Sequence, residues 1–545
     1  MTHPNASTAL ARVVVDELAC QGVEVMVIAP GSRSGALAIA AAQHPDIETR
    51  VVIDERSAAF HALGVARASR VPAAVLSTSG TAPANFFPAI VEADMSFVPL
   101  VVISADRPAE MQGVGANQTV DQVEMFGTRT RAYAGIEAPS AGEDSNVLWR
   151  GVVTRLVASA NGGSPGPVHL NVRFREPTVP VSDDGRVSAE PYGFATPRVR
   201  SLPMETGDEA HEDMPVLEAD RGLLIAGDGA YDRERLLGRA AELGWPILAT
   251  ALSGMRGRGV VSTYHHLLAK GVPAALQPET VVAVGAIGPS SRLETLIATA
   301  PTRVRIDRWG RRVDPERNAT HVLHGDVGEL LEQARPVSNE WALSWSEADQ
   351  RARSRLREIL SETRAMSGPA VVVAVDDLDW AALAVASSLP IRDVDAHLDH
   401  PGPVFANRGA SGIDGFVSTA LGVASRIPQT LALAGDLSLL HDSNGFIVDA
   451  AIDVTIVVVD NEGGGLFDSL PQARHAPEYE RLFVTRPNRS FRDLARFHGL
   501  RYEEAGDMAG LARAVGESLH RPGIDLIRVS VDREHDLAVR AQMEG

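Results

Sequence analysis

TLALAGDLS (residues 430–438) and VTIVVVDNEGGG (454–465) stand on either side of HDSNGFIVDAAID (441–453). Each of the two begins with an apolar run typical of a buried parallel strand, and we expect the segment between them to form a helix. Asp436 then falls at the carboxyl end of the first strand, and Asn461 ends the second strand 25 positions later. Because neighbouring strands of an open parallel sheet end at one crevice, the pattern predicts a carboxylate and an amide oxygen side by side.

Such a crevice suits a hard cation that bridges diphosphate oxygens, since these cations prefer carboxylate and carbonyl ligands. The glycines at 463–465 would let the backbone approach closely. The spacing resembles the thiamine diphosphate motif, in which a Gly-Asp pair precedes an Asn-containing turn by about 25 residues. The alternative is an ordinary strand end with a turn asparagine. A second Gly-Asp, at Asp228, has Ser253 at the matching position, and we interpret Asp228 as a turn residue.

The rest of the chain repeats the pattern of a short apolar run, a Gly- or Ser-rich turn and a helix-like stretch. This repeated pattern, in a chain of 545 residues, predicts an α/β protein with three consecutive Rossmann-like parallel-sheet domains, at 1–182, 183–345 and 346–545. The resemblance to the thiamine diphosphate motif implies that the first domain binds the pyrimidine of the cofactor and the third its diphosphate, with the second domain between them in sequence. The polar stretch 181–215 is predicted to be a linker, 339–366 a long connecting helix, and AVVVAVDD (370–377) the first strand of the third domain.

The composition argues against several classes of function. The formal charge is −19, which disfavours nucleic acid as a partner. Cys20 is the only cysteine, no run reaches the length of a membrane span, and the N-terminus lacks an unbroken apolar stretch, so we expect a soluble cytoplasmic enzyme. Anionic ligands would then need locally concentrated positive charge.

Glu55 is a candidate for activating the cofactor. It ends the apolar run VVIDE (51–55) and precedes a helix-like segment. Thiamine diphosphate enzymes need a carboxylate at the pyrimidine ring nitrogen, and theirs lies at a comparable place in the first domain. The alternative is a carboxylate that complements a helix dipole. Ile413, in NRGASGIDG (407–415), fits the bulky aliphatic residue that bends the cofactor, although it could be an ordinary core residue.

Several segments together resemble the 2-succinyl-5-enolpyruvyl-6-hydroxy-3-cyclohexene-1-carboxylate synthase family of menaquinone biosynthesis. They span all three predicted domains: PGSRS (30–34), DERSAAFHALG (54–64), SGTAPAN (79–85), DRP (106–108), GANQTVDQ (115–122), SSLPIR (387–392), NRGASGIDG (407–415), GDLS (435–438) and GGGLF (463–467).

The resemblance implies a transferase that decarboxylates 2-oxoglutarate with thiamine diphosphate and adds the resulting carbanion to isochorismate. CO2 is released and pyruvate is not. It also implies Mg2+ or Mn2+, no nucleic-acid or membrane partner, and a homodimer or homotetramer with active sites at the subunit interface. Both substrates are dicarboxylates, which forked guanidinium groups bind well. The rivals are another carboligase such as an acetolactate-synthase-like enzyme with flavin, and a catalytically inactive protein of this fold. A nicotinamide oxidoreductase is disfavoured because no strand is followed by G-x-G-x-x-G.

Site residues follow from the resemblance by matching position. The catalytic set would be Glu55, Gln118, Arg392 and Arg408. The cofactor would be held by Glu55, Ser388, Ile413, Gly435, Asp436, Leu437, Ser438, Asn461, Gly463 and Leu466, with the metal on Asp436, Asn461 and the carbonyl of Gly463. Substrates would contact Ser32, Arg33, Arg107, Asn117, Gln118, Arg292, Ser388, Arg392, Arg408 and Phe467.

Two positions depart from the family pattern. Glu462 adds a carboxylate where an asparagine-rich turn is common. A Lys-Arg pair of the central domain is replaced by Ser291 and Arg292, so Arg292 could equally be an ordinary surface arginine.

Overall fold

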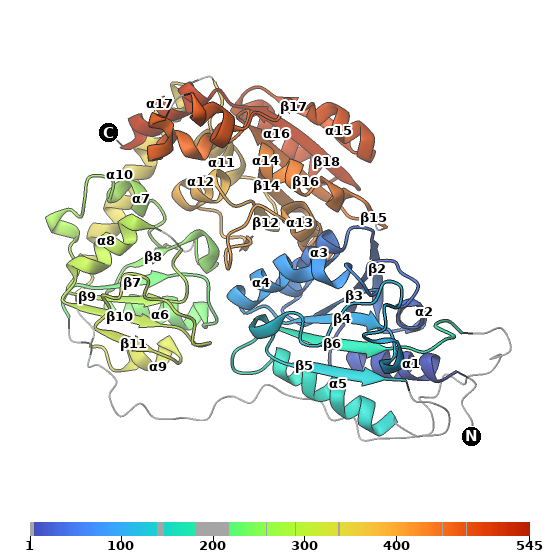
Figure 1. Ribbon diagram of the computed structural model, residues 1–545. Coiled ribbons are helices and arrows are strands. Elements are labelled where there is room, and N and C mark those ends of the chain that lie inside the picture. The colour runs from blue at the N-terminus through green and yellow to red at the C-terminus, as the bar shows by residue number, and fades with distance from the viewer. Residues whose placement is uncertain are drawn as a thin grey trace. The chain divides into compact units, whose positions relative to one another are not determined.

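The computed structural model describes residues 5–138, 146–180, 217, 219–257, 259–288, 290–335, 338–363, 365–449, 451–475 and 477–544 (Figure 1). The described residues form three sheets, as expected for an α/β protein. Packing divides the chain into two units. The first contains the described residues of 1–207, 407–427 and 440–452, and the second those of 208–406, 428–439 and 453–545. The predicted linker at 181–215 lies outside the described residues.

The first unit is built on a seven-stranded sheet with the order β15-β2-β1-β3-β4-β6-β5. Its pairings are parallel except that of β15 with β2, which is antiparallel. The strands are β1 (Val25–Ile28), β2 (Glu48–Val52), β3 (Ala73–Ser77), β4 (Leu100–Asp106), β5 (Tyr133–Glu137), β6 (Pro167–Arg173) and β15 (Val448–Asp449).

Helices cover both faces of this sheet, because successive residues of its strands point to opposite sides. On one face Val101 and Ile103 of β4 pack with α1 (Ala6–Cys20), α2 (Gly35–Gln43) and α5 (Asn146–Ala160). On the other, Leu100 and Val102 pack with α3 (Glu55–Ser69) and α4 (Phe87–Ser96).

Helix α13 (Phe416–Ala424) packs directly on α3 within the same unit. The contact depends on two glycines. A Cβ at Gly64 would lie 2.2 Å from the carbonyl oxygen of Thr419, and one at Gly422 would lie 2.2 Å from that of His61. The two backbones can therefore approach this closely only where no side chain intervenes.

In the second unit, one sheet has five parallel strands in the order β11-β10-β9-β7-β8. Its strands are β7 (Gly222–Ala226), β8 (Ile247–Ala249), β9 (Thr280–Val284), β10 (Thr302–Ile306) and β11 (His321–Leu323). The helices are α6 (Arg233–Leu243), α7 (Tyr264–Leu267), α8 (Ser291–Thr299), α9 (Val327–Glu332) and the long α10 (Glu340–Ser361), which confirms the predicted connecting helix.

The other sheet of the second unit has six parallel strands in the order β13-β12-β14-β16-β18-β17. They are β12 (Ala382–Val385), β13 (Val404–Phe405), β14 (Thr430–Gly435), β16 (Val454–Asp460), β17 (Arg501–Ala505) and β18 (Ile524–Ser530). The helices are α11 (Gly368–Asp376), α12 (Leu389–His397), α14 (Asp436–His441), α15 (Phe491–His498), α16 (Met508–Ser518) and α17 (Arg533–Glu544).

Two predicted elements are wrong. Residues 370–377 were expected to form a strand, but 368–376 form helix α11, whose amino terminus is capped by Ser367 and contains Pro369. A short apolar run does not distinguish a buried helix from a buried strand, and the cap and proline favour the helix. Residues 441–453 were expected to be helical. They instead include a 3-10 turn (Ser443–Phe446) and β15, because Val448 and Asp449 pair with the edge of β2.

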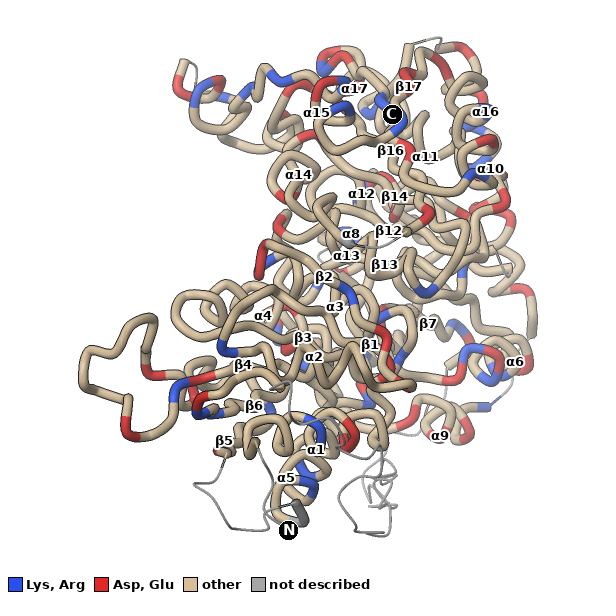
Figure 2. Tube along the Cα trace, turned by 90° about the vertical axis from the view of Figure 1, so that its right-hand side faces the viewer, with Lys and Arg blue, Asp and Glu red and all other residues tan. Residues whose placement is uncertain are grey.

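Charged residues of both signs are interspersed along the same elements, for example on α6 and α10 (Figure 2). The locally concentrated positive charge expected for an anionic ligand must therefore come from a particular group of side chains. Among the residues that the structure describes, no helix combines the length and hydropathy needed to cross a bilayer.

Candidate active site

Asp436 lies at the carboxyl end of β14, where the sequence placed it. Its side chain is 2% exposed and accepts hydrogen bonds from the backbone N–H groups of Leu437 and Gly463, both at 2.6 Å. Burial raises the pKa of this carboxyl to about 7, and the neighbouring carboxylate of Asp460 adds to the effect. Within the described chain it has no ion pair with lysine or arginine.

The turn after β16 completes this edge of the sheet. Strands β14 and β16 are parallel neighbours, with Gly435 opposite Val459, so Asn461 follows at the adjacent strand end. Gly463 has a φ of 125°, and a Cβ there would lie 2.1 Å from the carbonyl oxygen of Val484. Only glycine can occupy this position without rearrangement, and its N–H reaches Asp436.

Glu462 does not add its charge to the buried edge. Its side chain is 65% exposed and forms an ion pair with Arg486 at 3.1 Å. The departure from the family pattern therefore places a carboxylate on the surface.

These groups fit a hard cation. They combine a buried carboxylate without a basic partner, an amide side chain and a glycine turn, which together offer oxygen ligands of the kind that Mg2+ takes alongside phosphate oxygens. In the described residues there is no cluster of three or more His, Cys, Asp or Glu side chains, so a site made only of such ligands is absent there.

Helix α12 begins beside the same edge. Ser388 precedes it with a φ of 78°, which is unusual for a residue other than glycine, and Arg392 donates to the carbonyl of Ser388 at 2.7 Å. Burial lowers the pKa of Arg392. A Cβ on Gly435 would lie 3.8 Å from the ring of Pro390, so the start of α12 contacts the end of β14.

Leu466 and Phe467 lie in a 3-10 turn (Gly465–Ser469) that follows the glycines. Both are half-buried, and Phe467 packs edge-on against Phe483 with ring centroids 5.4 Å apart. This turn contacts the amide of Asn461, since a Cβ on Gly465 would lie 2.4 Å from its Nδ2 atom. The structure thus brings together, in the second unit, the predicted residues Ser388, Arg392, Gly435, Asp436, Leu437, Ser438, Asn461, Gly463, Leu466 and Phe467.

Glu55 is the first residue of α3 in the first unit, directly after Asp54, whose side chain caps the helix by accepting from Ser57. Glu55 is half-buried, and within the described chain no hydrogen bond or ion pair engages its carboxylate. Capping is therefore already provided by Asp54, and Glu55 is available for a ligand. Ile53, two residues before it, is 63% exposed.

A second group gathers at the carboxyl edge of the first sheet, where the neighbouring strands β1, β3 and β4 end. Arg107 is 8% exposed and donates to the hydroxyl of Ser79, and Gln118 donates to the carbonyl of Ser79 at 2.9 Å. The guanidinium of Arg33 is close enough to help lower the pKa of Arg107, although burial contributes more. The buried Nε of Arg107 lacks a hydrogen-bond partner in the described structure.

Two further predicted residues are exposed nearby. Ser32 lies next to Arg33 in one loop, and Asn117 lies next to Gln118 in another. The loop of Ser32 is held against the end of β3, since a Cβ on Gly31 would lie 2.3 Å from the Cβ of Thr78. The incompletely bonded guanidinium of Arg107 thus lies near that of Arg33, which pairs with Glu176 at 3.1 Å, and two arginines this close suit a ligand carboxylate.

The remaining predicted residues lie elsewhere. Arg408 and Ile413 are half-buried in the loop between β13 and α13, and this loop is anchored by Glu92, which accepts from the N–H groups of Gly409 and Ala410 at 2.9 and 2.7 Å. Arg292 donates to the carbonyl of His265 at 2.6 Å and pairs with Glu544.

Sequence reasoning missed Ser79, although it lies in the quoted segment SGTAPAN. It also missed Asp106 and Asn171, whose side chains are buried beneath Arg107. The signal for Asp106 was its place at the end of an apolar strand. Nothing local in the sequence indicates that Asn171 meets it, because 65 positions separate them.

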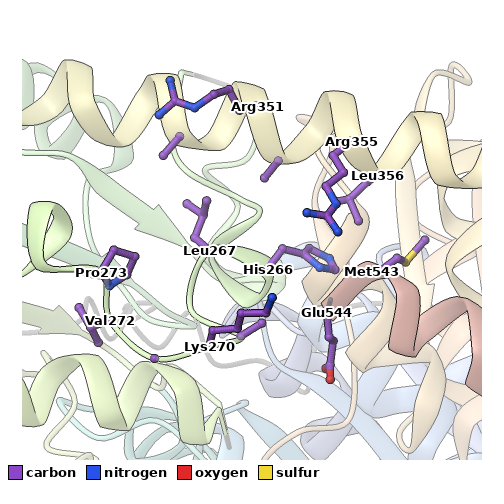
Figure 3. Close-up of a pocket in the computed structure, with 14 residues that line it drawn as sticks. His266, Leu267, Lys270, Val272, Pro273, Arg351, Arg355, Leu356, Met543 and Glu544 are labelled. Atoms are coloured by element: carbon purple, nitrogen blue, oxygen red, sulfur yellow. The ribbon is translucent and has the colours of Figure 1, made fainter.

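A cavity of about 480 Å3 lies in the second unit, lined by segment 266–273, α10 and the end of α17 (Figure 3). The side chains of Lys270 and Arg355 extend toward the imidazole of His266 in this view. Its lining contains none of the predicted site residues, although Glu544 connects it to Arg292.

Asp228 lies in the turn after β7, as interpreted from the sequence. Its backbone exchanges two hydrogen bonds of 2.9 Å with Ala286, and its carbonyl and carboxylate accept from Arg311 at 2.8 and 3.2 Å. These contacts connect the ends of β7 and β9, the neighbouring strands at which the strand order of this sheet reverses.

Comparisons with known proteins agree with this geometry. Residues 8–125 match the thiamine pyrophosphate enzyme, N-terminal TPP binding domain, and residues 197–377 match the middle domain of thiamine pyrophosphate enzymes. The structure resembles benzoylformate decarboxylase from Polynucleobacter necessarius, with a TM-score of 0.70, 15% identity and coverage of 96% of this chain and 98% of that one. The two domain matches define a thiamine pyrophosphate enzyme, and the structural resemblance shows the shared fold.

Relatives with similar sequences indicate one family within this class. The chain is 42% identical to the 2-succinyl-5-enolpyruvyl-6-hydroxy-3-cyclohexene-1-carboxylate synthase of Thermobifida fusca, over 99% of this chain and 98% of the relative, and 38% identical to that of Geobacillus kaustophilus, over 98% and 96%. The chain therefore belongs to the 2-succinyl-5-enolpyruvyl-6-hydroxy-3-cyclohexene-1-carboxylate synthase family.

Proposed function

We propose that this enzyme uses thiamine diphosphate and a divalent cation to decarboxylate 2-oxoglutarate and to join the remaining four-carbon unit to isochorismate. The family supports the reaction, and the paired arginines at the edge of the first sheet support it most directly. Arg107 is buried, incompletely hydrogen-bonded and close to Arg33, which suits an acceptor that carries carboxylates.

Asp436, Asn461 and the carbonyl of Gly463 would hold Mg2+ or Mn2+, and through it the diphosphate. The half-buried Leu466 and Ile413 would contribute apolar contacts to the cofactor, with Ser388, Gly435, Leu437 and Ser438 at the strand ends. When bound, thiamine diphosphate supplies a nucleophilic carbon and accepts the electron pair released by decarboxylation. The protein's part is to orient the substrates, exclude water and place protons.

Glu55 would hold a proton at the pyrimidine ring nitrogen. Its carboxylate is free of other partners within the described chain and begins a helix that is already capped, so neither folding nor capping requires it there. Gln118 and Asn117 would donate to the acceptor substrate, with Ser32, Arg33 and Arg107 binding its carboxylates.

Ser388, Arg392 and Arg408 would bind 2-oxoglutarate, with Phe467 forming an apolar wall. Arg392 is already oriented by its bond to the carbonyl of Ser388, which leaves further N–H groups of the guanidinium for a carboxylate. Arg292 remains a prediction, because its side chain is shared between His265 and Glu544.

We expect Arg392→Ala and Arg408→Ala to reduce turnover of 2-oxoglutarate while leaving thiamine diphosphate binding nearly unchanged. Removing one partner of a buried charged contact costs on the order of 2–5 kcal/mol, which is about 25-fold or more in kcat/KM. Steady-state kinetics and calorimetry measure the two effects. Arg513→Ala, which removes a surface arginine paired with Glu503, is the control. Loss of cofactor affinity equal to the loss of turnover would contradict the assignment.

We further propose a homodimer or homotetramer in the cytoplasm, with Glu55 of one chain serving the cofactor held by Asp436 of another. The large apolar side chains exposed in the first unit are candidates for burial against another subunit: Ile53, Phe87, Met95, Val114, Val120 and Val123.

Mixing two inactive variants tests the shared site. Glu55→Gln and Asp436→Ala chains, unfolded together and refolded at equal concentration, should regain roughly a quarter of the parent activity, because half of the dimers are mixed and each mixed dimer has one intact site. Each variant refolded alone is the control. No recovery in a mixture shown by mass spectrometry to contain mixed dimers would place both residues in one chain's site.

A further inference from the structure

The buried side chain of Asn171 lies directly beneath the candidate acceptor site. Asn171, on β6, is fully buried and faces Ser104 and Asp106 of the neighbouring strand β4. Its Nδ2 donates to Asp106 at 3.0 Å, and its Oδ1 accepts from Ser104 at 2.8 Å and from Gln122 at 2.9 Å. The amide orientation is unambiguous, because the Asp106 carboxylate can only accept.

Asp106 fixes the start of the loop that follows β4. One carboxylate oxygen accepts from the backbone N–H of Arg107 at 2.7 Å and from the side chain of Gln112 at 3.0 Å. The other accepts from Asn171, and Arg173 lies 3.6 Å away as a counter-charge. The backbone of Arg107 is thus held by the carboxylate that Asn171 orients.

Gln122 fixes the other end of the same loop. Residues 113–115, 117 and 118 are exposed, whereas Gln122 is fully buried and donates to Asn171 and, at 3.4 Å, to the carbonyl of Ala105. Apart from the 3-10 turn at Ala109–Met111, this loop contains no helix or strand, so its side chains depend on such anchors to stay in place.

The network ends in a neutral histidine. Burial lowers the pKa of His169 to about 3, and its Nε2 lies 2.7 Å from the hydroxyl of Ser104. Since that hydroxyl donates to Asn171, the imidazole carries its hydrogen on Nε2 and donates to Ser104. All polar atoms of the Asn171 side chain are therefore used, and none can be lost without leaving a buried group unpaired.

We infer that Asn171 is a positioning residue that joins both ends of loop 107–122, through Asp106 at one end and Gln122 at the other, and so presents Arg107, Asn117 and Gln118 to the acceptor substrate. Its effect on catalysis rests on the proposed function, whereas its effect on the loop does not. Loss of the hydrogen bonds from Asn171 to Asp106 and Gln122 should weaken binding of the acceptor substrate and leave the decarboxylation of 2-oxoglutarate intact.

Near-isosteric variants separate the two ends. Asn171→Leu removes the donor to Asp106 and the acceptor for Ser104 and Gln122, so it releases both ends of the loop, whereas Gln122→Met releases only the far end. Each should raise KM for isochorismate at least tenfold, with CO2 release from 2-oxoglutarate alone changed less than twofold. Gln21→Met, which removes a buried amide bonded to Glu17 in the same unit, is the control.

Backbone amide hydrogen exchange tests, without any substrate, whether Asn171 holds both ends of loop 107–122. Asn171→Leu should speed exchange of the Arg107 amide by at least tenfold, whereas Gln122→Met should speed exchange at 119–123 and leave Arg107 protected. Asn171→Asp should retain most of the protection at neutral pH, because a carboxyl buried against the Asp106 carboxylate keeps its proton and donates to it, and should lose this protection as the pH rises. Around Asp106 and residue 171, the charged or titratable groups are Arg107, Arg173, Tyr133 and His169.

Unchanged loop exchange in both variants would overturn the inference even if the enzyme uses these substrates. Equal rises in KM for both substrates would overturn the claimed selectivity for the acceptor. If the parent protein fails to turn over isochorismate, the proposed function fails, and the exchange experiment still decides whether Asn171 joins the loop ends.

Discussion

Glu55→Gln should bind thiamine diphosphate with nearly the affinity of the parent protein and lose product formation by several orders of magnitude. Glutamine keeps the size and hydrogen-bonding ability of the side chain but cannot take and return a proton. The helix should remain intact, because its cap is Asp54. Loss of a group that acts only in proton transfer lowers kcat without weakening binding.

Exchange of the C2 hydrogen of bound cofactor with D2O, followed by NMR, measures the proton transfer directly. We expect it to collapse in Glu55→Gln and to persist in Glu462→Gln, which alters an exposed carboxylate paired with Arg486. If the Glu55→Gln protein exchanges this hydrogen as fast as the parent, Glu55 is only a residue of the first helical turn.

Asp436→Ala should abolish saturable binding of thiamine diphosphate in the presence of Mg2+. The carboxylate is the one acidic group of the predicted ligand set, and a hard cation held only by an amide and a carbonyl loses most of its electrostatic attraction. The variant also leaves the N–H of Gly463 without its acceptor, which weakens the glycine turn.

Calorimetry with and without the metal distinguishes these effects. Asp436→Asn keeps an acceptor for Gly463 while removing the charge, so it should also fail to bind if the carboxylate holds the metal. Parent and variants in EDTA should all behave alike. Saturable, metal-independent binding to Asp436→Ala would show that the diphosphate site is elsewhere.

The carboxyl edge of the six-stranded sheet could be predicted, because the sequence pattern that indicates it is local. Each apolar run ends where its polar residue begins, and parallel strands carry Asp436 and Asn461 to neighbouring ends. Helix α11 could not be predicted, because the short apolar run at 370–375 fits either a buried helix or a buried strand until its neighbours are known. The same ambiguity concealed β15, whose pairing partner is almost 400 residues away in sequence.

Arg33, Arg107 and Gln118 stay predicted ligand contacts, and the contacts that hold these side chains in the fold could not be predicted from the sequence. Ser79 meets Arg107 only because β3 and β4 are neighbours in the sheet, and Asn171 meets Asp106 only through the pairing of β4 with β6. Such contacts depend on strand order, which sequence periodicity does not specify.

The most direct test of the proposed function is a mass-spectrometric assay of the purified protein with 2-oxoglutarate and isochorismate. We expect a product that retains all atoms of isochorismate and the four-carbon unit, together with CO2, only when thiamine diphosphate and Mg2+ are present. Replacing 2-oxoglutarate by pyruvate should give no comparable product, because the second carboxylate would be missing. Equal use of pyruvate, or product formation without thiamine diphosphate, would contradict the proposed function.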